Sequence, residues 1–326
     1  MSPEEYFNEL LANLNLSSQE IDQISKKHLS LRERLRELLP ITDDFLTGSY
    51  PRNTIIRPIG QDKFDVDFFL VFSNDTFGAY ELPKLLEVVK FALEKIRDED
   101  SDIVNIKQQN RSIGIEYRGN FQIDVVPAIE IEKDRLYNIF DKRTRQPIDS
   151  NPLLHGKHLS EVNRNTECNS VRRLVPIIKL LKSWKREKCD YVKSFHLELL
   201  AVEILQENLI TSFSSGIARF FSSGMNYLQD VSLVDPANTE NLIDDYLDKD
   251  GVRGQLLKLI AKEKEIAENA LYLEEIGEKE KAVSEWKKIF SWGDYSKNVA
   301  TTLIPRVPTI ITTPPKQHCN VAIKHN

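Results

Sequence analysis

Residues 64–72 read FDVDFFLVF, a nearly continuous apolar run that contains two charged residues, Asp65 and Asp67. The run is rich in Val and Phe, which is typical of a buried β-strand. Because side chains alternate between the two faces of a strand, both carboxylates lie on the same face. Two carboxylates this close repel each other unless a cation lies between them. The stretch therefore predicts a core strand that carries part of a cation site.

A third carboxylate, Asp124, lies in the apolar segment FQIDVVPAI at residues 121–129. An Asp in such surroundings is costly unless it is paired, hydrogen-bonded or bound to a metal. Three carboxylates on neighbouring strands suit Mg²⁺, which completes its shell with water and phosphates, and two such ions can clamp both oxygens of a phosphoryl transfer. We therefore expect Asp65, Asp67 and Asp124 to be catalytic and to bind two magnesium ions, with manganese also tolerated.

A Gly-Ser turn precedes the first strand, at Gly48 and Ser49 in LTGSYPRNT. Glycine allows close approach of the backbone, and N–H groups and a hydroxyl can bind a terminal phosphate. Alone, a Gly-Ser pair is usually a simple turn, and an Asp-x-Asp pair is usually a solvated strand edge. The ordered combination with a later strand Asp is far more specific and favours a nucleotide site. Arg52 and Lys63 lie near this turn, but the sequence assigns them no role.

Composition narrows the class of protein. The chain has 326 residues, 40% hydrophobic and 29% charged, which is typical of a globular protein of about two domains. Its net charge of −6 argues against a general nucleic-acid binder, so we expect no DNA or RNA template. No apolar run is long enough to span a membrane, and the acidic start is unlike a signal peptide. The three cysteines form no CxxC pair, which indicates a reducing cytoplasm.

A zinc site is a weaker alternative. His155, His158 and Cys168 are loosely spaced, and Cys189 is available as a fourth ligand. The competing interpretation is a polar loop beside a packed thiol.

The order of elements predicts an α+β core followed by a helical region. We expect helix over the first forty residues, up to Pro40, and a mostly antiparallel or mixed sheet. Residues 131–170 are polar and read as a crossover with little regular structure. Pro176 is harmless if it lies in the first turn of a helix. The expected strands are 54–58, 66–72, 113–117 and 121–129. The expected helices are 81–96, 171–188, 194–208, 214–230 and 281–290, with a further helix that begins at residue 241.

The segments LTGSYPRNTIIRP, FDVDFFLVF and FQIDVVPAI resemble the polymerase-β-like nucleotidyltransferases. Within them, the chain is most similar to the bacterial relatives of animal cyclic GMP–AMP synthase and oligoadenylate synthase, the CD-NTases of anti-phage (CBASS) signalling. The segments VRRLVPIIKLLKSWKREK, SFHLELLAVEIL, AVSEWKKIF and TTPPKQ extend the resemblance over nearly the whole chain. It implies a nucleotidyltransferase core with an N-terminal spine helix at 1–165, an α-helical lobe at 166–305 and an active site in the cleft between them. The last stretch, which is rich in Pro and Thr, predicts a flexible tail at 306–326.

The resemblance also implies roles for three residues of the helical region. Lys182 and Ser194 match residues that contact the donor triphosphate, and Phe195 matches an aromatic that stacks on a base. Ser194 is also a candidate helix N-cap, and a helix N-terminus attracts anions. Lys182 has the alternative of extending along an apolar face towards water. Phe195 has the alternative of filling the core.

The implied activity is magnesium-dependent transfer of a nucleotidyl group from a nucleoside triphosphate to a ribose hydroxyl, followed by a second transfer that closes a ring. We expect ATP as one substrate, with the second base undetermined, a monomeric enzyme, and an effector that binds the product rather than this chain. The alternatives are a synthase of linear oligonucleotides, an RNA-tailing enzyme, or a catalytically silent nucleotide-binding regulator. The intact carboxylate triad argues against the last. Activation by DNA is not implied, and the final residues Ile-Lys-His-Asn differ from the small C-terminal residue through which some relatives are conjugated.

Overall fold

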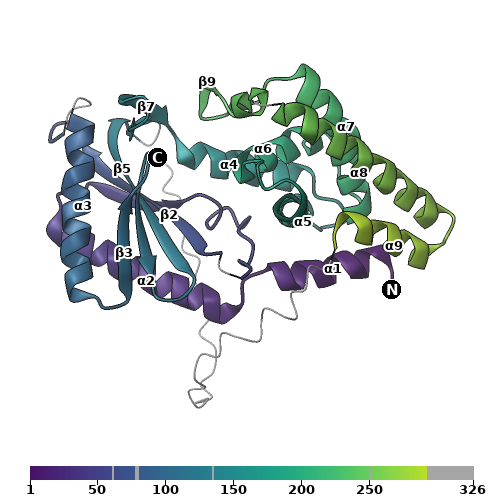
Figure 1. Ribbon diagram of the computed structural model, residues 1–326, viewed down its shortest axis with the longest axis horizontal. Coiled ribbons are helices and arrows are strands. Elements are labelled where there is room, and N and C mark those ends of the chain that lie inside the picture. Colours follow the sequence, from purple (N-terminus) through teal and green to yellow (C-terminus); the bar gives the residue numbers. More distant parts are fainter. Residues whose placement is uncertain (61, 78–80, 134–135, 250, 292–326) are drawn as a thin grey trace, which may run out of the picture. The chain divides into compact units, whose positions relative to one another are not determined.

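A seven-stranded mixed sheet is built around two parallel strands, β2 and β5 (Figure 1). Strand β1 pairs with β2 on its outer side, while β4 and β6 follow each other along the other edge of β5. The computed structural model describes residues 1–60, 62–77, 81–133, 136–249 and 251–291. The strands of this sheet are β1 (Asp43–Thr47), β2 (Phe64–Ser73), β3 (Ile103–Gln108), β4 (Ile113–Tyr117), β5 (Phe121–Glu132), β6 (Leu136–Asp141) and β7 (Gln146–Ser150).

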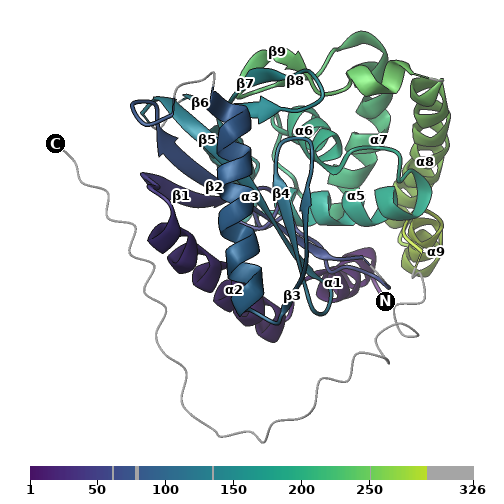
Figure 2. The ribbon, with the colours of Figure 1, turned by 60° about the vertical axis from the view of Figure 1, so that its left-hand side comes forward.

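The two faces of the sheet have different surroundings. Val66, Phe68 and Leu70 point into a large core that α2 (Ser18–Leu38) and α3 (Leu82–Glu99) complete, and Figure 2 shows α3 lying across the sheet. Phe69 and Val71 point to the other face and pack in a smaller apolar cluster. Asp65 and Asp67 alternate in step with these two residues, so the carboxylates lie on the face away from α3.

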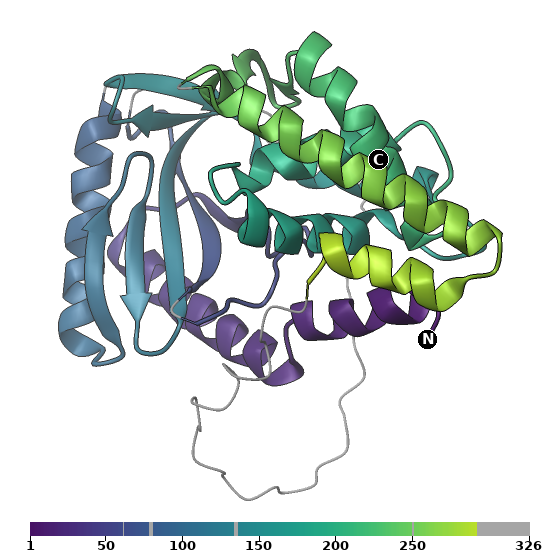
Figure 3. The same cartoon turned by 45° about the vertical axis from the view of Figure 1, so that its right-hand side comes forward.

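The N-terminal segment forms two helices instead of the expected single one. Helix α1 (Pro3–Leu14) is followed by its C-cap Asn15, and α2 begins after Ser17, whose side chain forms a capping box with Glu20. Helix α1 packs against α5, α7 and α9, whereas α2 packs against α3 (Figure 3). The predicted spine is therefore jointed, and each half has its own packing partners.

The crossover expected at 131–170 is wrong, because it contains β6, β7 and α4 (Pro152–Asn165). Strand β6 has an alternating buried pattern that its polar neighbours hid, and α4 begins with Pro152 after the side-chain cap Asn151. The strand expected at 54–58 is also wrong. The N–H groups of Thr54 and Ile55 bond to the carbonyl of Ser49, which folds this segment back as a loop.

Most helices of this region lie where the sequence predicts them. The helix expected from residue 241 is wrong at its start, because residues 238–242 form a strand, residues 245–248 form a 3-10 helix, and α8 (Val252–Glu275) begins only at Val252. Pro176 lies in the first turn of α5, which confirms that it is compatible with the helix. None of the helices within the described residues combines the length and the apolar character needed to cross a membrane. The predicted tail at 306–326 lies outside the described residues, and the predicted boundary at 165 stays a prediction. The remaining elements are α5 (Leu174–Lys188), α6 (Ser194–Leu205), α7 (Phe213–Asp230), β8 (Val234–Asp235), β9 (Asn238–Leu242), the 3-10 helix η2 (Asp245–Asp248), α8 (Val252–Glu275) and α9 (Lys279–Ile289).

Candidate active site

Strand pairing brings the three predicted carboxylates together. In the parallel pair β2–β5, Asp67 lies directly opposite Asp124, and Asp65 is two residues before Asp67 on the same face. One ligand oxygen from each carboxylate lies within 4.8 Å of the others. Asp124 is buried, Asp67 is half-buried and Asp65 is exposed. Among the described residues, this is the group of acidic, His and Cys side chains whose geometry can hold a metal ion.

The electrostatics of the triad favour a bound cation. Burial, followed by repulsion from Asp124 and Asp67, raises the pKa of Asp65 to about 7. Burial and the charge of Asp124 raise the pKa of Asp67 to about 6, and burial also raises the pKa of Asp124. Asp65 has an exposed surface, yet it lies in the wall of a cavity where protein limits its hydration. A metal between the carboxylates would remove this repulsion, so the donor set fits a divalent cation.

Two amide side chains fix the orientation of Asp124. Gln109 and Gln122 each donate a hydrogen bond of 2.9 Å from Nε2 to the same oxygen, Asp124 Oδ1. Ser112 Oγ in turn donates to Gln109 Oε1 at 3.1 Å. Gly114 lies opposite Asp124, and a Cβ there would approach Gln109 Nε2 to 2.7 Å. The arrangement leaves Oδ2 as the oxygen available to a ligand, and nothing in the sequence pattern had indicated these residues.

The Gly-Ser turn lies against the triad. Gly48 has φ +73°, and a Cβ at this position would lie 1.7 Å from Asp67 Oδ2. Glycine is therefore required both by the backbone conformation and by the approach of the carboxylate. The carbonyl of Ser49 accepts hydrogen bonds from Thr54 at 2.9 Å and Ile55 at 3.1 Å, which closes the turn. Ser49 lines the same cavity as Asp65 and Asp67.

This cavity, of about 1030 Å³, collects the residues predicted from both halves of the sequence. The sheet and the Gly48–Ser49 turn form one wall, and the start of α6 with the segment after β9 forms another. Its volume is at the upper end of the range for small-molecule sites, so a large polar ligand fits. The predicted residues that line it are Gly48, Ser49, Asp65, Asp67, Lys182, Ser194 and Phe195.

Ser194 is the first residue of α6 and not its N-cap, so the capping prediction is wrong. The N-cap is Lys193, whose side chain makes no capping bond. The hydroxyl of Tyr246 accepts the backbone N–H of Lys193 at 2.9 Å, and the Lys193 ammonium lies 4.2 Å from the Tyr246 ring centre. Ser194 therefore stays exposed at an unblocked helix N-terminus that borders the cavity.

Lys182 is buried and fully engaged, which rules out the alternative of extension towards water. Its ammonium donates to Glu198 Oε2 at 2.9 Å and to the carbonyl and hydroxyl oxygens of Thr54, both at 3.1 Å. Arg52 donates from Nε to the other oxygen of Glu198 at 2.5 Å. Burial alone would raise the pKa of Glu198, but the charges of Lys182 and Arg52 lower it to about 2.

Glu198 is a further charged residue of the site, and its sequence surroundings mark it as unusual. It lies within the apolar run of SFHLELLAVEIL, as Asp124 lies within FQIDVVPAI. A charged residue in such surroundings requires partners.

Phe195 is half-buried at the edge of the cavity. The ring centres of Phe195 and His155 are 4.8 Å apart. The guanidinium carbon of Arg52 lies over the face of the Phe195 ring, 5.6 Å from its centre. His155 Nε2 is 2.6 Å from Asp235 Oδ1. His155, His158 and Cys168, considered above as zinc ligands, are not among the side chains that the described structure gathers into a metal-binding group.

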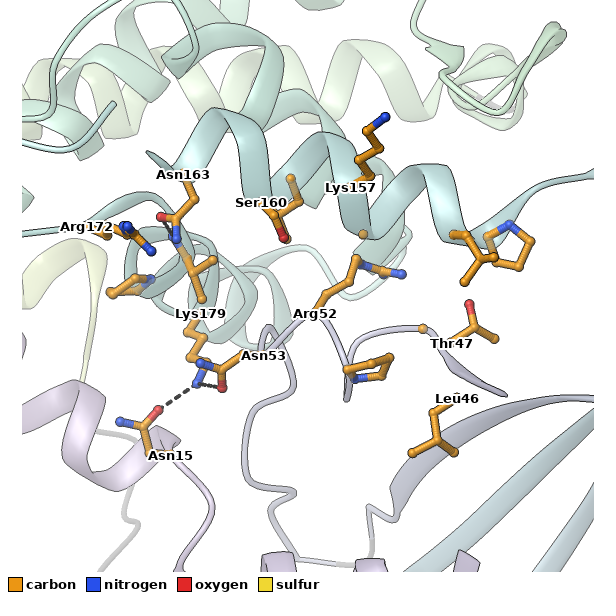
Figure 4. Close-up of a pocket in the computed structure, with 18 of the residues that line it drawn as sticks. Asn15, Leu46, Thr47, Arg52, Asn53, Lys157, Ser160, Asn163, Arg172 and Lys179 are labelled. Carbon is orange, nitrogen blue, oxygen red and sulfur yellow. Dashed lines mark hydrogen bonds between the residues drawn. The ribbon is translucent and has the colours of Figure 1, made fainter. Parts of the chain in front are cut away.

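A second pocket, of about 710 Å³, borders the same turn (Figure 4). Thr47, Gly48 and Arg52 line both cavities. In the second pocket, Lys179 donates to Asn15 Oδ1 at 2.8 Å and to Asn53 Oδ1 at 3.1 Å. These bonds connect the joint after α1, the turn and α5.

The parallel strand pair with its facing carboxylates, the Gly-Ser turn and the helical region together define a polymerase-β-like nucleotidyltransferase fold. Comparison with protein families gives the narrower class. Residues 1–163 match the model of the Second Messenger Oligonucleotide or Dinucleotide Synthetase domain, known as SMODS. The chain belongs to this family, as the sequence resemblance implied.

Among curated proteins, similar relatives are cyclic oligonucleotide synthases. A cyclic AMP-AMP-AMP synthase of Acinetobacter sp. is 30% identical over 215 residues, which are 62% of this chain and 59% of that protein. The CBASS oligonucleotide cyclase CdnC of Escherichia coli is 25% identical over 190 residues, which are 57% of this chain and 59% of the relative. The chain thus matches about three fifths of the length of these relatives.

Solved structures share the fold over nearly the whole chain. The E. coli MS115-1 CdnC structure with ATP superposes with a TM-score of 0.70 at 18% identity, covering 89% of this chain and 98% of that one. The Vibrio cholerae DncV cyclic AMP-GMP synthase with the linear intermediate pppA(3′,5′)pG gives 0.72 at 13% identity, covering 89% and 96%. At these identities the likeness confirms the α+β nucleotidyltransferase fold.

Proposed function

We propose that this protein is a metal-dependent nucleotidyltransferase that makes a cyclic oligonucleotide second messenger from nucleoside triphosphates in anti-phage signalling. The observation that carries the proposal is the carboxylate triad, whose oxygens lie within 4.8 Å of one another and whose members Asp65 and Asp67 line the same cavity as Gly48, Ser49 and Ser194. The names of the curated relatives support the cyclic product.

In the proposed site, Asp65, Asp67 and Asp124 would hold two magnesium ions, and Asp124 would lie on the side of the attacking ribose hydroxyl. Manganese is expected to substitute. Bound Mg²⁺ supplies charge for the attacking and leaving oxygens of an in-line displacement. Gln109 and Gln122 keep Asp124 turned so that Oδ2 is free. Asp124 would help to deprotonate the ribose hydroxyl as its oxygen forms the bond to the α-phosphorus and the bond to the leaving pyrophosphate breaks.

The donor triphosphate is proposed to lie between the Gly48–Ser49 turn and the start of α6. Ser49 and Ser194 donate hydroxyl hydrogen bonds to phosphate oxygens, and the N–H groups at the start of α6 add the favourable end of the helix dipole. Lys182 contributes positive charge from behind the turn. Phe195, held against His155, offers a ring on which a base stacks, and stacking accepts any base.

Ring closure requires that the linear intermediate binds a second time, turned round. A cavity of about 1030 Å³ with one carboxylate triad and an aromatic at its edge suits this reuse. A net charge of −6 disfavours a long polyanionic primer, which a tailing enzyme would need. ATP is the proposed first substrate, the protein is proposed to act as a cytoplasmic monomer, and an effector is proposed to bind the product.

Product analysis tests the proposal. The protein is incubated with all four nucleoside triphosphates and Mg²⁺, treated with phosphatase, and the products are examined by mass spectrometry. We expect small phosphatase-resistant rings with two or three phosphates, and no requirement for added RNA or DNA. A ladder of phosphatase-sensitive linear chains would favour the linear or tailing enzyme. Nucleotide binding without release of pyrophosphate would favour the silent regulator.

A further inference from the structure

A buried cluster of two cations on one carboxylate lies beside the proposed phosphate site. The side chains of Arg52, Lys182 and Glu198 are 9%, 7% and 4% exposed. Glu198 accepts Arg52 on Oε1, and it accepts Lys182 and the Thr54 hydroxyl on Oε2. The cluster carries one positive charge that no carboxylate within it balances.

Arg52 is the member with unused hydrogen-bonding capacity. Its guanidinium has donors on three nitrogens, yet in the part of the chain that the structure describes only Nε has an acceptor. The remaining donors belong to a side chain that lines both cavities and lies over the Phe195 ring. A nearly buried guanidinium with free terminal N–H groups at a cavity wall is suited to an anion, and phosphate oxygens match its fork geometry.

We propose that Arg52 is a ligand of the donor triphosphate, and that Glu198 is a positioning residue that orients Arg52 and Lys182 while its charge limits how tightly the triphosphate binds. This inference rests on the proposed function and deepens it. Glu198 lies on α6, whereas Arg52 and Thr54 lie on the segment that follows the Gly48–Ser49 turn, so the cluster fixes that turn relative to Ser194.

The charge of Glu198 has opposite effects on the empty and occupied site. In the empty site it balances one buried cation, and its removal would leave two cations close together with no carboxylate bonded to either of them and only the charge of Asp67 nearby. In the occupied site the phosphates supply negative charge, and a buried carboxylate a few ångströms away repels them. Glu198 therefore stabilises the ligand-free protein and weakens triphosphate binding. Limited affinity suits an active site that must release pyrophosphate and readmit its own intermediate.

The experiment compares Glu198→Gln with the wild-type protein and with Glu263→Gln. Glutamine keeps the shape and a hydrogen-bond acceptor but removes the charge. Glu263, on α8, is the matched control. It is fully buried, its carboxylate pairs with the Lys188 ammonium at 2.8 Å, and it lines neither cavity. Binding of a non-hydrolysable ATP analogue with Mg²⁺ is measured by calorimetry, turnover by pyrophosphate release, and melting temperature with and without the analogue.

We expect Glu198→Gln to bind the analogue about tenfold more tightly and to turn over about tenfold more slowly, with a lower melting temperature that the analogue raises more than in the wild type. Glu263→Gln should lower the melting temperature while leaving affinity and turnover unchanged. If Glu198→Gln behaved like this control, or bound the analogue more weakly, the inference would be overturned.

A second variant covers the case in which Glu198→Gln does not fold. Arg52→Lys keeps the positive charge beside Glu198 but removes the terminal guanidinium donors. It should weaken binding of the ATP analogue about tenfold and leave adenosine binding unchanged; equal affinity for the analogue would remove Arg52 from the phosphate site. If the wild type itself failed to bind the analogue, the proposed function would fail rather than this inference.

Discussion

At the scale of single residues, the triad holds like charges together at a cost that only a cation or a proton relieves. The pKa of Asp65 is raised from its usual range to about 7, so the folded protein keeps this proton to a higher pH than the unfolded chain does. The resulting loss of stability is absent below about pH 4, grows as pH rises through about 7, and stays constant above it. Substitution of Asp65 by an uncharged residue should remove this loss of stability.

Asp65→Asn should therefore abolish product formation and, in EDTA at pH 8, raise stability by about 1 kcal/mol, a figure discounted for the exposure of Asp65. The difference should shrink at pH 5, where the wild type is already protonated. Added Mg²⁺ should stabilise the wild type and not the variant. The measurement is thermal unfolding at both pH values with and without metal; a variant that kept near-wild-type turnover would contradict the metal assignment.

At the scale of elements, the serines at the starts of α6 and α7 differ in their hydrogen bonds. Ser194 makes no capping bond, whereas Ser212 caps α7 by accepting from Ser215 N at 3.1 Å in a capping box. The two serines stand at the first turns of successive helices in one region of the fold. They therefore form a matched pair for testing which kind of role each has.

Ser194→Ala should weaken binding of the ATP analogue by about tenfold, because a charge-assisted hydrogen bond is lost, with little change in melting temperature. Ser212→Ala should lower stability by about 1 kcal/mol and leave nucleotide binding unchanged. Calorimetric titration and thermal unfolding of both variants check this pair. Equal affinity of Ser194→Ala and the wild type would exclude Ser194 from the phosphate site.

The sequence was most informative where an apolar run contained an isolated charge. Asp65, Asp67 and Asp124 were found because a carboxylate in a core strand needs a partner, and strand alternation fixed their common face. The same physical argument applies to Glu198, a carboxylate within an apolar helix. Gln109 could not be found, because its importance comes from a hairpin that brings it to Asp124 across the sheet. Strand β6 was hidden because its polar residues obscured the alternation.

At the scale of the whole molecule, α1 ties the start of the chain to its helical region. Phe7 packs against the rings of Phe213, Trp286 and Phe290, with ring centres 6.0, 5.3 and 5.8 Å away, and Tyr6 donates to the carbonyl of Phe290. Residues 1–165 cut out as a separate piece would expose this apolar face. A boundary at residue 165 would therefore cut through an apolar core that both sides share.

Phe7→Ala should destabilise the protein by about 3–5 kcal/mol, because it leaves a cavity among large aromatic side chains. Tryptophan fluorescence comes from Trp184 and Trp286 in the helical region and from Trp292, which lies just outside the described residues. We expect this fluorescence and far-UV circular dichroism to show one coincident transition in urea, in the variant as in the wild type. Two separate transitions would show that the core and the helical region unfold independently.

The contact between α1 and α9 also has a consequence for synthesis of the protein on the ribosome. Helix α1 leaves the exit tunnel before the aromatic side chains that cover Phe7, because these come from residues 213, 286 and 290. At about 5–20 residues per second, the apolar face of α1 waits roughly a quarter of a minute to a minute for its last partners. During that time the nascent chain offers this face to chaperones or to neighbouring chains. The proposed enzyme would therefore become active only after the end of α9 has been translated.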